Sequence, residues 1–233
     1  MNVKKIPILC LFLICRYAFA QHIPKNQYGL EVINTMELYQ QSVQIDSNQL
    51  MVPLKDWLRG LHYDIRYATR HNFTGSKLYD TAFVLVRLPV AKALKAVNDS
   101  LQKMGYCLLI FDGYRPYSVT EKMWKIVPDD RYAADPKKGS GHNRGAAIDL
   151  SIYDLNHHHP LKMPTDFDDF TDLAHHDYII TDPEVRKNRA LLKSLMEWQG
   201  FKALSTEWWH YYLPDYKKYP LMDVDFESLI EGK

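Results

Sequence analysis

Residues 90–116 read VAKALKAVNDSLQKMGYCLLIFDGYRP and contain the clearest pattern in the chain. Apolar residues recur there at helical spacing, at Val90, Leu94, Val97, Leu101 and Met104. The spacing predicts a helix over residues 90–104, with Pro89 in its first turn and Gly105 after its end. The apolar run at residues 106–111 follows at once and predicts a buried strand.

Two further helices are predicted on the C-terminal side of this stretch. Ser118 and Glu121 have the spacing of a capping box, which predicts a helix that ends near Val127. Pro183 directly follows an aspartate, a typical helix start, and Gly200 is suited to the end of that helix.

Additional strands are predicted from apolar and aromatic runs at residues 146–152, 201–204 and 208–213. Helices and strands are therefore mixed along the chain without strict alternation. That order favours a single-domain α+β fold with a mainly antiparallel sheet flanked by helices. The chain has 233 residues, which is enough to bury one substantial core.

The charge balance excludes some classes of partner. The chain has 29 Lys and Arg residues against 28 Asp and Glu residues, and no long basic run. Nothing in this balance indicates binding to nucleic acid or to an anionic membrane surface.

The first 20 residues have the three parts of an export signal. A positive start and a short apolar run precede small residues at the cleavage site (Lys4 and Lys5, residues 6–15, Ala18 and Ala20). The run is too short to span a bilayer, so we expect cleavage, no stable membrane insertion, and a periplasmic or secreted protein.

The expected organisation is a signal peptide at residues 1–20, an N-terminal lead-in at 21–50 and the main domain at 51–233. Cys107 is the one cysteine beyond the signal, so no internal disulfide is expected. It lies in an apolar run and is expected to be a buried, unreactive side chain.

The segment SGHNRGAAID at residues 140–149 joins a Gly-rich loop to a predicted strand. Its glycines permit a tight turn, so His142 can lie beside the strand. Asp149 is a carboxylate in an apolar stretch, and such a charge is costly unless it is paired or bound to a metal. The alternative is an ion pair with an arginine such as Arg144.

The segment EWWH at residues 207–210 supplies a third candidate ligand. A catalytic zinc keeps three protein ligands, and His142, Asp149 and His210 make that number. Glu207 is close to His210 and is a candidate general base. Because a spacing of three puts the two on opposite faces of an ideal strand, we expect a bend or turn at Glu207. The alternative is an aromatic strand with a surface glutamate and a packed histidine.

Arg115 follows a predicted strand in the segment DGYRP at residues 112–116. An arginine there can reach into a cleft and stabilise the oxyanion of a tetrahedral intermediate. The alternative is pairing with a nearby aspartate or covering of the surface. The sequence has no His-Glu-x-x-His helix, Gly-x-Ser-x-Gly elbow or phosphate loop, which argues against the commoner hydrolase and nucleotide-binding classes.

Taken together, these segments resemble a known family, the D-alanyl-D-alanine dipeptidases. These are zinc peptidases related to vancomycin-resistance dipeptidases and to D,D-carboxypeptidases. The likeness extends over most of the chain, from about residue 63 to residue 213. The motifs that carry it, in the family's order, are YDIRYAT at 63–69, NFTG at 72–75, DGYRP at 112–116, SGHNRGAAIDL at 140–150 and EWWH at 207–210.

The resemblance implies hydrolysis of the D-Ala-D-Ala dipeptide in cell-wall peptide metabolism, with one Zn²⁺ per chain in a central cleft. It implies His142, Asp149 and His210 as zinc ligands, Glu207 as general base and then proton donor, and Arg115 as stabiliser of the transition state.

The resemblance also implies three residues at the substrate pocket. Asp168 falls near the position of the dipeptide's ammonium group, and Ser140 and Tyr67 fall at the pocket wall. A site that satisfies both termini of a free dipeptide should reject longer or capped peptides, because it would leave a buried charge unpaired.

Two other functions share part of this pattern. A D,D-carboxypeptidase on peptidoglycan stem peptides would share the metal chemistry and differ in how the pocket closes, although the motifs favour the dipeptidase. A non-catalytic zinc-binding domain would not need Glu207 or Arg115. The oligomeric state is left open by the sequence.

Overall fold

The computed structural model describes residues 22–232, so the predicted signal peptide at 1–20 lies outside the described residues. The helices are α1 (Met36–Ile45), α2 (Leu54–Trp57), α3 (Leu88–Gln102), α4 (Tyr117–Ile126), α5 (Pro183–Trp198) and α6 (Phe226–Glu231). The strands are β1 (Val32–Ile33), β2 (Met51–Pro53), β3 (His62–Tyr63), β4 (Leu85–Arg87), β5 (Tyr106–Asp112), β6 (Ala147–Asp154), β7 (His159–Pro160), β8 (Lys202–Ala203), β9 (His210–Tyr212) and β10 (Leu221–Met222).

The largest sheet of the described residues has the strand order β3-β5-β6-β9-β8, and β7 also pairs with β6. The prediction of a mainly antiparallel sheet needs correction, because this sheet is mixed. β3 pairs with β5 in parallel, whereas the other pairings in the sheet are antiparallel. The chain between β3 and β5 passes through α3, a crossover that lets β5 run in the same direction as β3.

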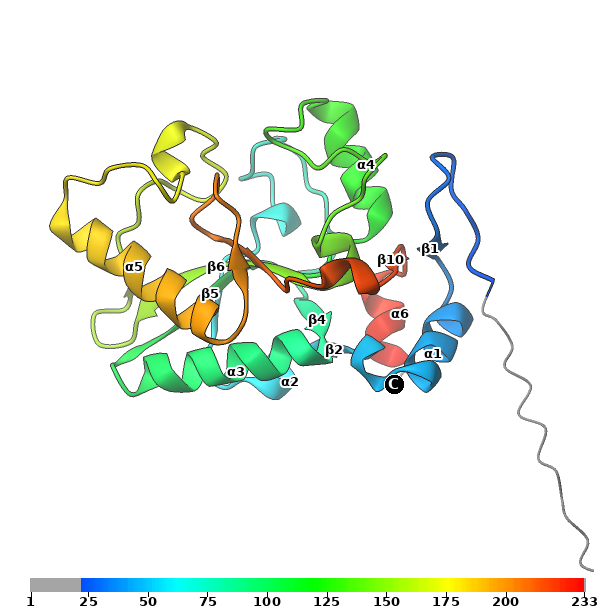
Figure 1. Cartoon of the computed structure of the whole chain (residues 1–233), viewed down its shortest axis with the longest axis horizontal. Coiled ribbons are helices and arrows are strands. Elements are labelled where there is room, and N and C mark those ends of the chain that lie inside the picture. Colours follow the sequence, from blue (N-terminus) through cyan, green and yellow to red (C-terminus); the bar gives the residue numbers. More distant parts are fainter. Residues whose placement is uncertain (1–21, 233) are drawn as a thin grey trace, which may run out of the picture.

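Two long helices cover one face of this sheet. α3 packs on β5, and α5 packs on both β6 and α3, as Figure 1 shows with α3 below the strands and α5 beside them. The apolar positions predicted for the first helix are confirmed as buried, except for Met104, which lies after the end of α3 and is exposed. Gly105 then takes a φ of +81°, a conformation that glycine adopts without a steric cost.

The third predicted helix is also confirmed. α5 begins at Pro183, and the side chain of Asp182 caps it by accepting hydrogen bonds from the backbone N–H groups of Glu184 and Val185. Gly200 follows the helix with a φ of +85°.

The capping box predicted for the second helix was wrong. α4 begins at Tyr117, and its N-cap residue, Pro116, makes no side-chain capping bond. The backbone N–H of Ser118 donates instead to Asp223 Oδ1 at 2.8 Å, across a sequence separation of 105 residues. A tertiary contact therefore takes the place of the local cap.

The two C-terminal strands are shorter than predicted, since β8 contains two residues and β9 three. Trp208 and Trp209 precede β9 in a turn, with both indole rings buried. In this turn the backbone N–H of His210 is 3.4 Å from the carbonyl oxygen of Glu207. The turn expected at Glu207 is therefore present.

The N-terminal segment packs against the main body of the chain. β1 pairs in parallel with β10 near the other end of the sequence, and these elements lie together on the right of Figure 1. Tyr39 on α1 is buried, and its hydroxyl accepts a hydrogen bond from the backbone N–H of Met51.

Cys107 is free and buried, as expected. No helix within residues 22–232 is long and apolar enough to cross a membrane.

Candidate active site

Neighbouring strands of the large sheet bring the first two candidate ligands together. Asp149 of β6 lies opposite His210 of β9 in the antiparallel register. Residues directly opposite each other in such a pair project their side chains on the same face of the sheet. Asp149 also lies opposite Asp112, the last residue of β5. The ends of three strands thus meet at one place.

The third candidate ligand lies on a short turn just before β6. His142 begins the 3-10 helix η3 (His142–Arg144), which ends at Gly145 with a φ of +65°. A Cβ atom on Gly141 would come within 2.8 Å of the Cβ of Ala147. Because only glycine allows this close approach, the loop can hold His142 beside the strand.

His142, Asp149 and His210 form a cluster whose ligand atoms all lie within 4.8 Å of one another. His142 Nε2 is 3.1 Å from His210 Nδ1 and 3.3 Å from Asp149 Oδ2, and Asp149 Oδ1 is 2.9 Å from His210 Nδ1. The other ring nitrogen of His142, Nδ1, is 2.7 Å from the carbonyl oxygen of Gly113. If that N–H donates to the carbonyl, Nε2 is left unprotonated toward the cluster.

This donor set suits a divalent metal such as zinc, for which two imidazoles and a carboxylate are common ligands. The alternative pairing of Asp149 with Arg144 is wrong. Arg144 points away and donates from Nη1 to the carbonyl oxygen of Tyr219.

The charges within the cluster compensate one another. Burial raises the pKa of Asp149, but His142 and His210 outweigh it and hold that pKa below its usual range. Burial lowers the pKa of His210, but Asp149 outweighs it and leaves that pKa above its usual value. The carboxylate therefore stays ionised, as a metal ligand must.

Glu207 lies next to the cluster, in the turn before β9. Its Oε2 is 3.8 Å from His210 Nδ1, and its side chain is largely buried. Burial raises the pKa of Glu207, and the nearby His210 offsets this only in part. A carboxylate with a raised pKa accepts a proton more readily, which suits a general base.

Arg115 follows β5 and is almost fully buried. Its Nη2 and Nε donate to Asp112 Oδ2 at 2.6 and 3.1 Å, and its guanidinium lies 5.1 Å from the ring centre of Tyr67. The pairing with an aspartate, considered from the sequence as an alternative, is present. Arg115 nevertheless lines the same cavity as the cluster.

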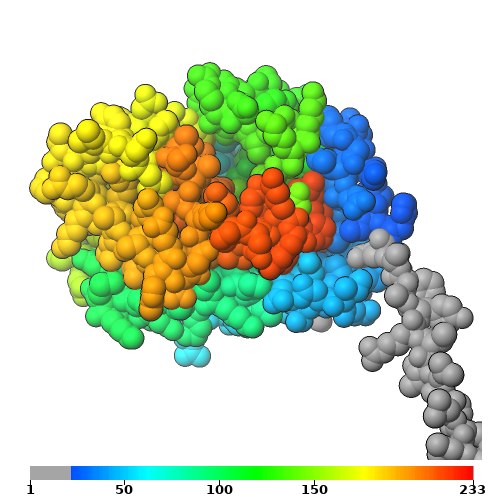
Figure 2. All heavy atoms as spheres, in the orientation of Figure 1, coloured from blue at the N-terminus to red at the C-terminus, as the bar shows by residue number. Residues whose placement is uncertain are grey.

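All eight candidate residues line one cavity of about 220 Å³. Figure 2 shows a hollow between the green segment and the yellow-to-orange segment of the chain. The wall of the cavity includes residues of both segments: residues 130–134 from the first, and Phe170, Leu204, Glu207 and Trp209 from the second.

Asp168 lines the cavity from a loop and has an incomplete set of partners. Its Oδ1 accepts a hydrogen bond from the hydroxyl of Tyr67 at 3.0 Å, but its Oδ2 is buried without any partner among residues 22–232. Its φ of +62° is uncommon for a residue other than glycine. Burial, with the charge of Asp149 second, raises the pKa of Asp168 well above its usual range.

Ser140 lies at the wall of the cavity and is hydrogen-bonded to the loop that carries His142. Its backbone N–H donates to Asn143 Oδ1 at 3.0 Å, and its Oγ accepts from the backbone N–H of Asn143 at 3.2 Å.

The sequence did not point to three residues that hold this site together. Asp112 binds Arg115 and also accepts a hydrogen bond from the hydroxyl of Tyr79 at 2.8 Å. Asn143, fully buried, donates to the carbonyl oxygen of Arg115 at 2.9 Å and to Thr120 Oγ1 at 2.8 Å. The position of Asp112 directly after an apolar run was a signal that could have been used. Tyr79 lies in an irregular segment, where the sequence gives no comparable signal.

Among solved structures, the chain is matched in part by VanYB and by an LD-carboxypeptidase. VanYB in complex with D-Alanine-D-Alanine matches 64% of this chain and 79% of its own, with 14% identity and a TM-score of 0.38. The LD-carboxypeptidase LdcB matches 57% of this chain and 63% of its own, with 17% identity and a TM-score of 0.36.

Sequence relatives are closer. A D-alanyl-D-alanine dipeptidase of Escherichia coli (strain K12) is 35% identical over 170 residues, which cover 73% of this chain and 88% of that protein. Proteins of the same name from Enterococcus faecalis and Enterococcus faecium are 33% and 32% identical, and cover 72% and 74% of this chain and 92% and 95% of their own lengths. The peptidase M15 family model, described as D-ala-D-ala dipeptidase, matches residues 47–228. The chain therefore belongs to the D-ala-D-ala dipeptidase family of M15 peptidases.

Proposed function

We propose that this protein is a zinc-dependent dipeptidase that hydrolyses D-Ala-D-Ala to free D-alanine. Membership of the family supports the reaction. One observation supports a substrate with a free amino group. Asp168 Oδ2 has no hydrogen-bond partner among the described residues, and Asp168 lines the same cavity as the cluster of His142, Asp149 and His210. A free ammonium group would supply the partner that this oxygen lacks.

The proposed reaction divides the work among the residues of the cavity. His142, Asp149 and His210 would hold the zinc, which when bound lowers the pKa of water and polarises a scissile carbonyl. Glu207 accepts the proton of the attacking water and later donates it to the leaving amine. Arg115, held by Asp112, stabilises the negative charge that develops on the carbonyl oxygen.

Asp168 and Tyr67 would fix the free amino terminus of the dipeptide. The hydroxyl of Tyr67 holds one carboxylate oxygen of Asp168, so the other oxygen points to a defined place. The small volume of about 220 Å³ also favours a short substrate. An ammonium group would supply the counter-charge that lets the buried carboxyl group of Asp168 ionise, whereas a capped amine or a longer peptide would not supply it.

The place of action in this proposal is outside the cytoplasm, in the periplasm or beyond the cell, on D-Ala-D-Ala derived from the cell wall. The sequence pattern of residues 1–20 supports it. N-terminal sequencing of the mature protein from fractionated cells tests it: a start at Gln21 supports export, and a retained Met1 in the cytosolic fraction contradicts it.

The test of the activity is release of D-alanine by the zinc-loaded protein from three substrates in parallel. These are D-Ala-D-Ala, N-acetyl-D-Ala-D-Ala and a stem pentapeptide that ends in D-Ala-D-Ala. We expect release from the free dipeptide alone. Release mainly from the pentapeptide would assign the protein to the D,D-carboxypeptidases. No release from any of the three would support a non-catalytic zinc-binding domain.

A further inference from the structure

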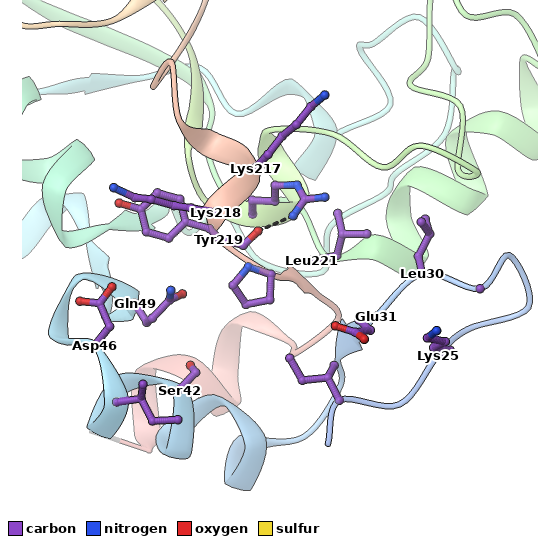
Figure 3. Close-up of a pocket in the computed structure, with 15 residues that line it drawn as sticks. Lys25, Leu30, Glu31, Ser42, Asp46, Gln49, Lys217, Lys218, Tyr219 and Leu221 are labelled. Atoms are coloured by element: carbon purple, nitrogen blue, oxygen red, sulfur yellow. Dashed lines mark hydrogen bonds between the residues drawn. The ribbon is translucent and has the colours of Figure 1, made fainter. Parts of the chain in front are cut away.

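A second cavity, of about 520 Å³, lies outside the catalytic cavity and shares none of its lining residues. Its walls come from three parts of the chain: residues 23–31, residues 42–49 with the end of α1, and residues 217–221. Figure 3 shows these segments around the hollow. Arg144, the last residue of η3, completes the wall. The turn that presents His142 to the first cavity therefore presents Arg144 to the second.

Arg144 supplies a positive charge to this wall, and no carboxylate of the described residues forms an ion pair with it. Its Nη1 donates to the carbonyl oxygen of Tyr219, the bond drawn as a dashed line in Figure 3. Its remaining guanidinium donors have no partner among residues 22–232.

Arg87 lies behind the same wall and adds a second positive charge. It is fully buried, and its guanidinium donates to the carbonyl oxygens of Arg144, at 2.8 Å, and of Gln49. It also contacts Met222 Sδ. In the described part of the chain no carboxylate is paired with it, and burial lowers the pKa of Arg87 to about 10. A buried charge without a counter-charge is costly, and an anion nearby would offset that cost.

The remaining charged residues around the cavity do not cancel these two arginines. The other positively charged residues that line the cavity are Lys25, Lys217 and Lys218, and the negatively charged ones are Glu31 and Asp46. Lys218 is paired with Asp215 at 2.5 Å, whereas Lys217 is exposed and forms no ion pair with any of the described residues. Because Asp215 offsets the charge of Lys218, the cations Arg144, Lys25 and Lys217 remain against Glu31 and Asp46, and the charge of the wall is positive.

Gln49 gives this cavity a hydrogen-bonding group that also lacks a partner. The residue is 9% exposed, and its Oε1 is buried and has no hydrogen bond within the described part of the chain. Figure 3 shows its amide at the cavity, between Asp46 and the segment of Tyr219. A buried carbonyl oxygen needs a donor, so a ligand here should offer an N–H or O–H group as well as a negative charge.

We propose that this cavity binds a small ligand that carries an oxyanion group and a hydrogen-bond donor. The oxyanion contacts Arg144 and Lys217, and the charge of Arg87 behind the wall favours it. The donor group contacts Gln49 Oε1. The proposal does not depend on the reaction in the first cavity, since the two cavities share no residue.

Hydrogen phosphate and sulfate provide a matched pair of probes. At pH 8 both carry about two negative charges, but only hydrogen phosphate has an O–H group. Calorimetric titration of the zinc-loaded protein, at constant ionic strength set with chloride, measures both affinities. We expect hydrogen phosphate to bind more tightly than sulfate.

Three variants test whether phosphate binds in this cavity. Arg144→Gln should weaken phosphate binding about 10-fold or more, because it removes a charged hydrogen bond. Lys217→Gln should weaken it about 2- to 5-fold and preserves the fold, because the side chain is exposed and unpaired. Arg186→Gln, on the exposed side of α5, should change nothing. Phosphate binding elsewhere, for example at the metal cluster, would not respond to Lys217→Gln.

The proposal is overturned if phosphate does not bind, if Lys217→Gln binds it as tightly as the unchanged protein, or if sulfate binds equally well.

Discussion

The two ends of the catalytic cavity are built in different ways. At one end, Asp149 contacts both His142 and His210, and two paired strands and a glycine-bounded turn hold these three residues. At the other end, Asp168 lies in a loop at a φ of +62°, with one carboxylate oxygen on Tyr67 and the other buried alone.

This difference separates groups that the chain satisfies by itself from a group that a ligand must satisfy. The histidines hold the pKa of Asp149 below its usual range, whereas burial raises that of Asp168 far above it. A strained backbone and an unpartnered buried oxygen both cost stability, and such costs are concentrated at functional sites. We therefore expect substrate selection at the end of the cavity that contains Asp168. We expect hydrolysis at the end that contains His142, Asp149 and His210, called the metal end below.

The largest effect is expected at the metal end, from Glu207→Gln. The amide keeps the shape of the side chain but cannot accept the proton of water, so turnover of D-Ala-D-Ala should fall about 10²- to 10⁴-fold. Metal content, measured by atomic absorption, should be unchanged, because Glu207 is not one of the three clustered ligands. Glu184→Gln, exposed at the start of α5, is the matched control. Near-normal turnover by the metal-loaded variant would disprove the role of Glu207.

The next effect is expected at the other end, from Asp168→Asn. The amide oxygen of the asparagine can still accept the hydrogen bond from the hydroxyl of Tyr67. The variant cannot ionise, however, so it lacks the negative charge that would pair with the ammonium group of the substrate. We expect kcat/KM for D-Ala-D-Ala to fall about 10- to 100-fold, the size of a lost charged hydrogen bond. Metal content should not change.

The capped dipeptide sharpens this result. N-acetyl-D-Ala-D-Ala has no ammonium group and is not expected to be hydrolysed, so it is used here as an inhibitor. It should inhibit Asp168→Asn at least as strongly as it inhibits the unchanged protein. An equal weakening of the binding of both peptides would mean that Asp168 supports the structure of the cavity and does not select the free amine.

The residues of the metal end could be found from the sequence because each one is unusual among its neighbours in the chain. Asp149 interrupts an apolar strand, His142 lies between glycines, and Glu207 precedes aromatic residues. The turn of η3 is set by nearby residues, among them Gly145. The pairing that places Asp149 opposite His210 is a long-range contact, which the sequence patterns alone did not give.

Features that depend on distant contacts could not be predicted in the same way. The start of α4 is set by Asp223, more than 100 residues away, so the local capping pattern at Ser118 was misleading. The mixed character of the sheet depends on β3, which has two residues and therefore no measurable periodicity. The helix α1 did leave a signal that was not used, with Met36, Tyr39 and Val43 at helical spacing.

A smaller effect is expected from Tyr67→Phe. This change removes the hydroxyl that donates to Asp168 Oδ1 at 3.0 Å and leaves the carboxylate in place. The charge still attracts the ammonium group but is less well oriented, so kcat/KM should fall about 3- to 10-fold, chiefly through KM. Tyr178→Phe, at an exposed position, provides the control. A loss as large as that of Asp168→Asn would mean that the orientation of the carboxylate matters more than its charge.

The last effect concerns stability, and its sign is opposite to that of the activity. The folded-state pKa of Asp168 is raised, so above the unfolded pKa of about 3.9 the native protein retains a proton that the unfolded chain releases. The free energy of unfolding therefore falls as pH rises through this range. In Asp168→Asn this contribution to the fall is absent, because asparagine does not titrate. Asparagine also tolerates a positive φ.

We expect thermal unfolding of Asp168→Asn to occur a few degrees above that of the unchanged protein at pH 8, which corresponds to roughly 1–3 kcal/mol. The difference should shrink at pH 5, because the loss of stability accumulates from the unfolded pKa of about 3.9 upward and is still small only about one pH unit above it. Other titrating groups are common to both proteins and cancel in the comparison. A stabilisation that is independent of pH would trace to the backbone conformation and not to the buried charge. A destabilised variant would mean that Asp168 already has its partner within the chain, and the two ends of the cavity would then not differ as described.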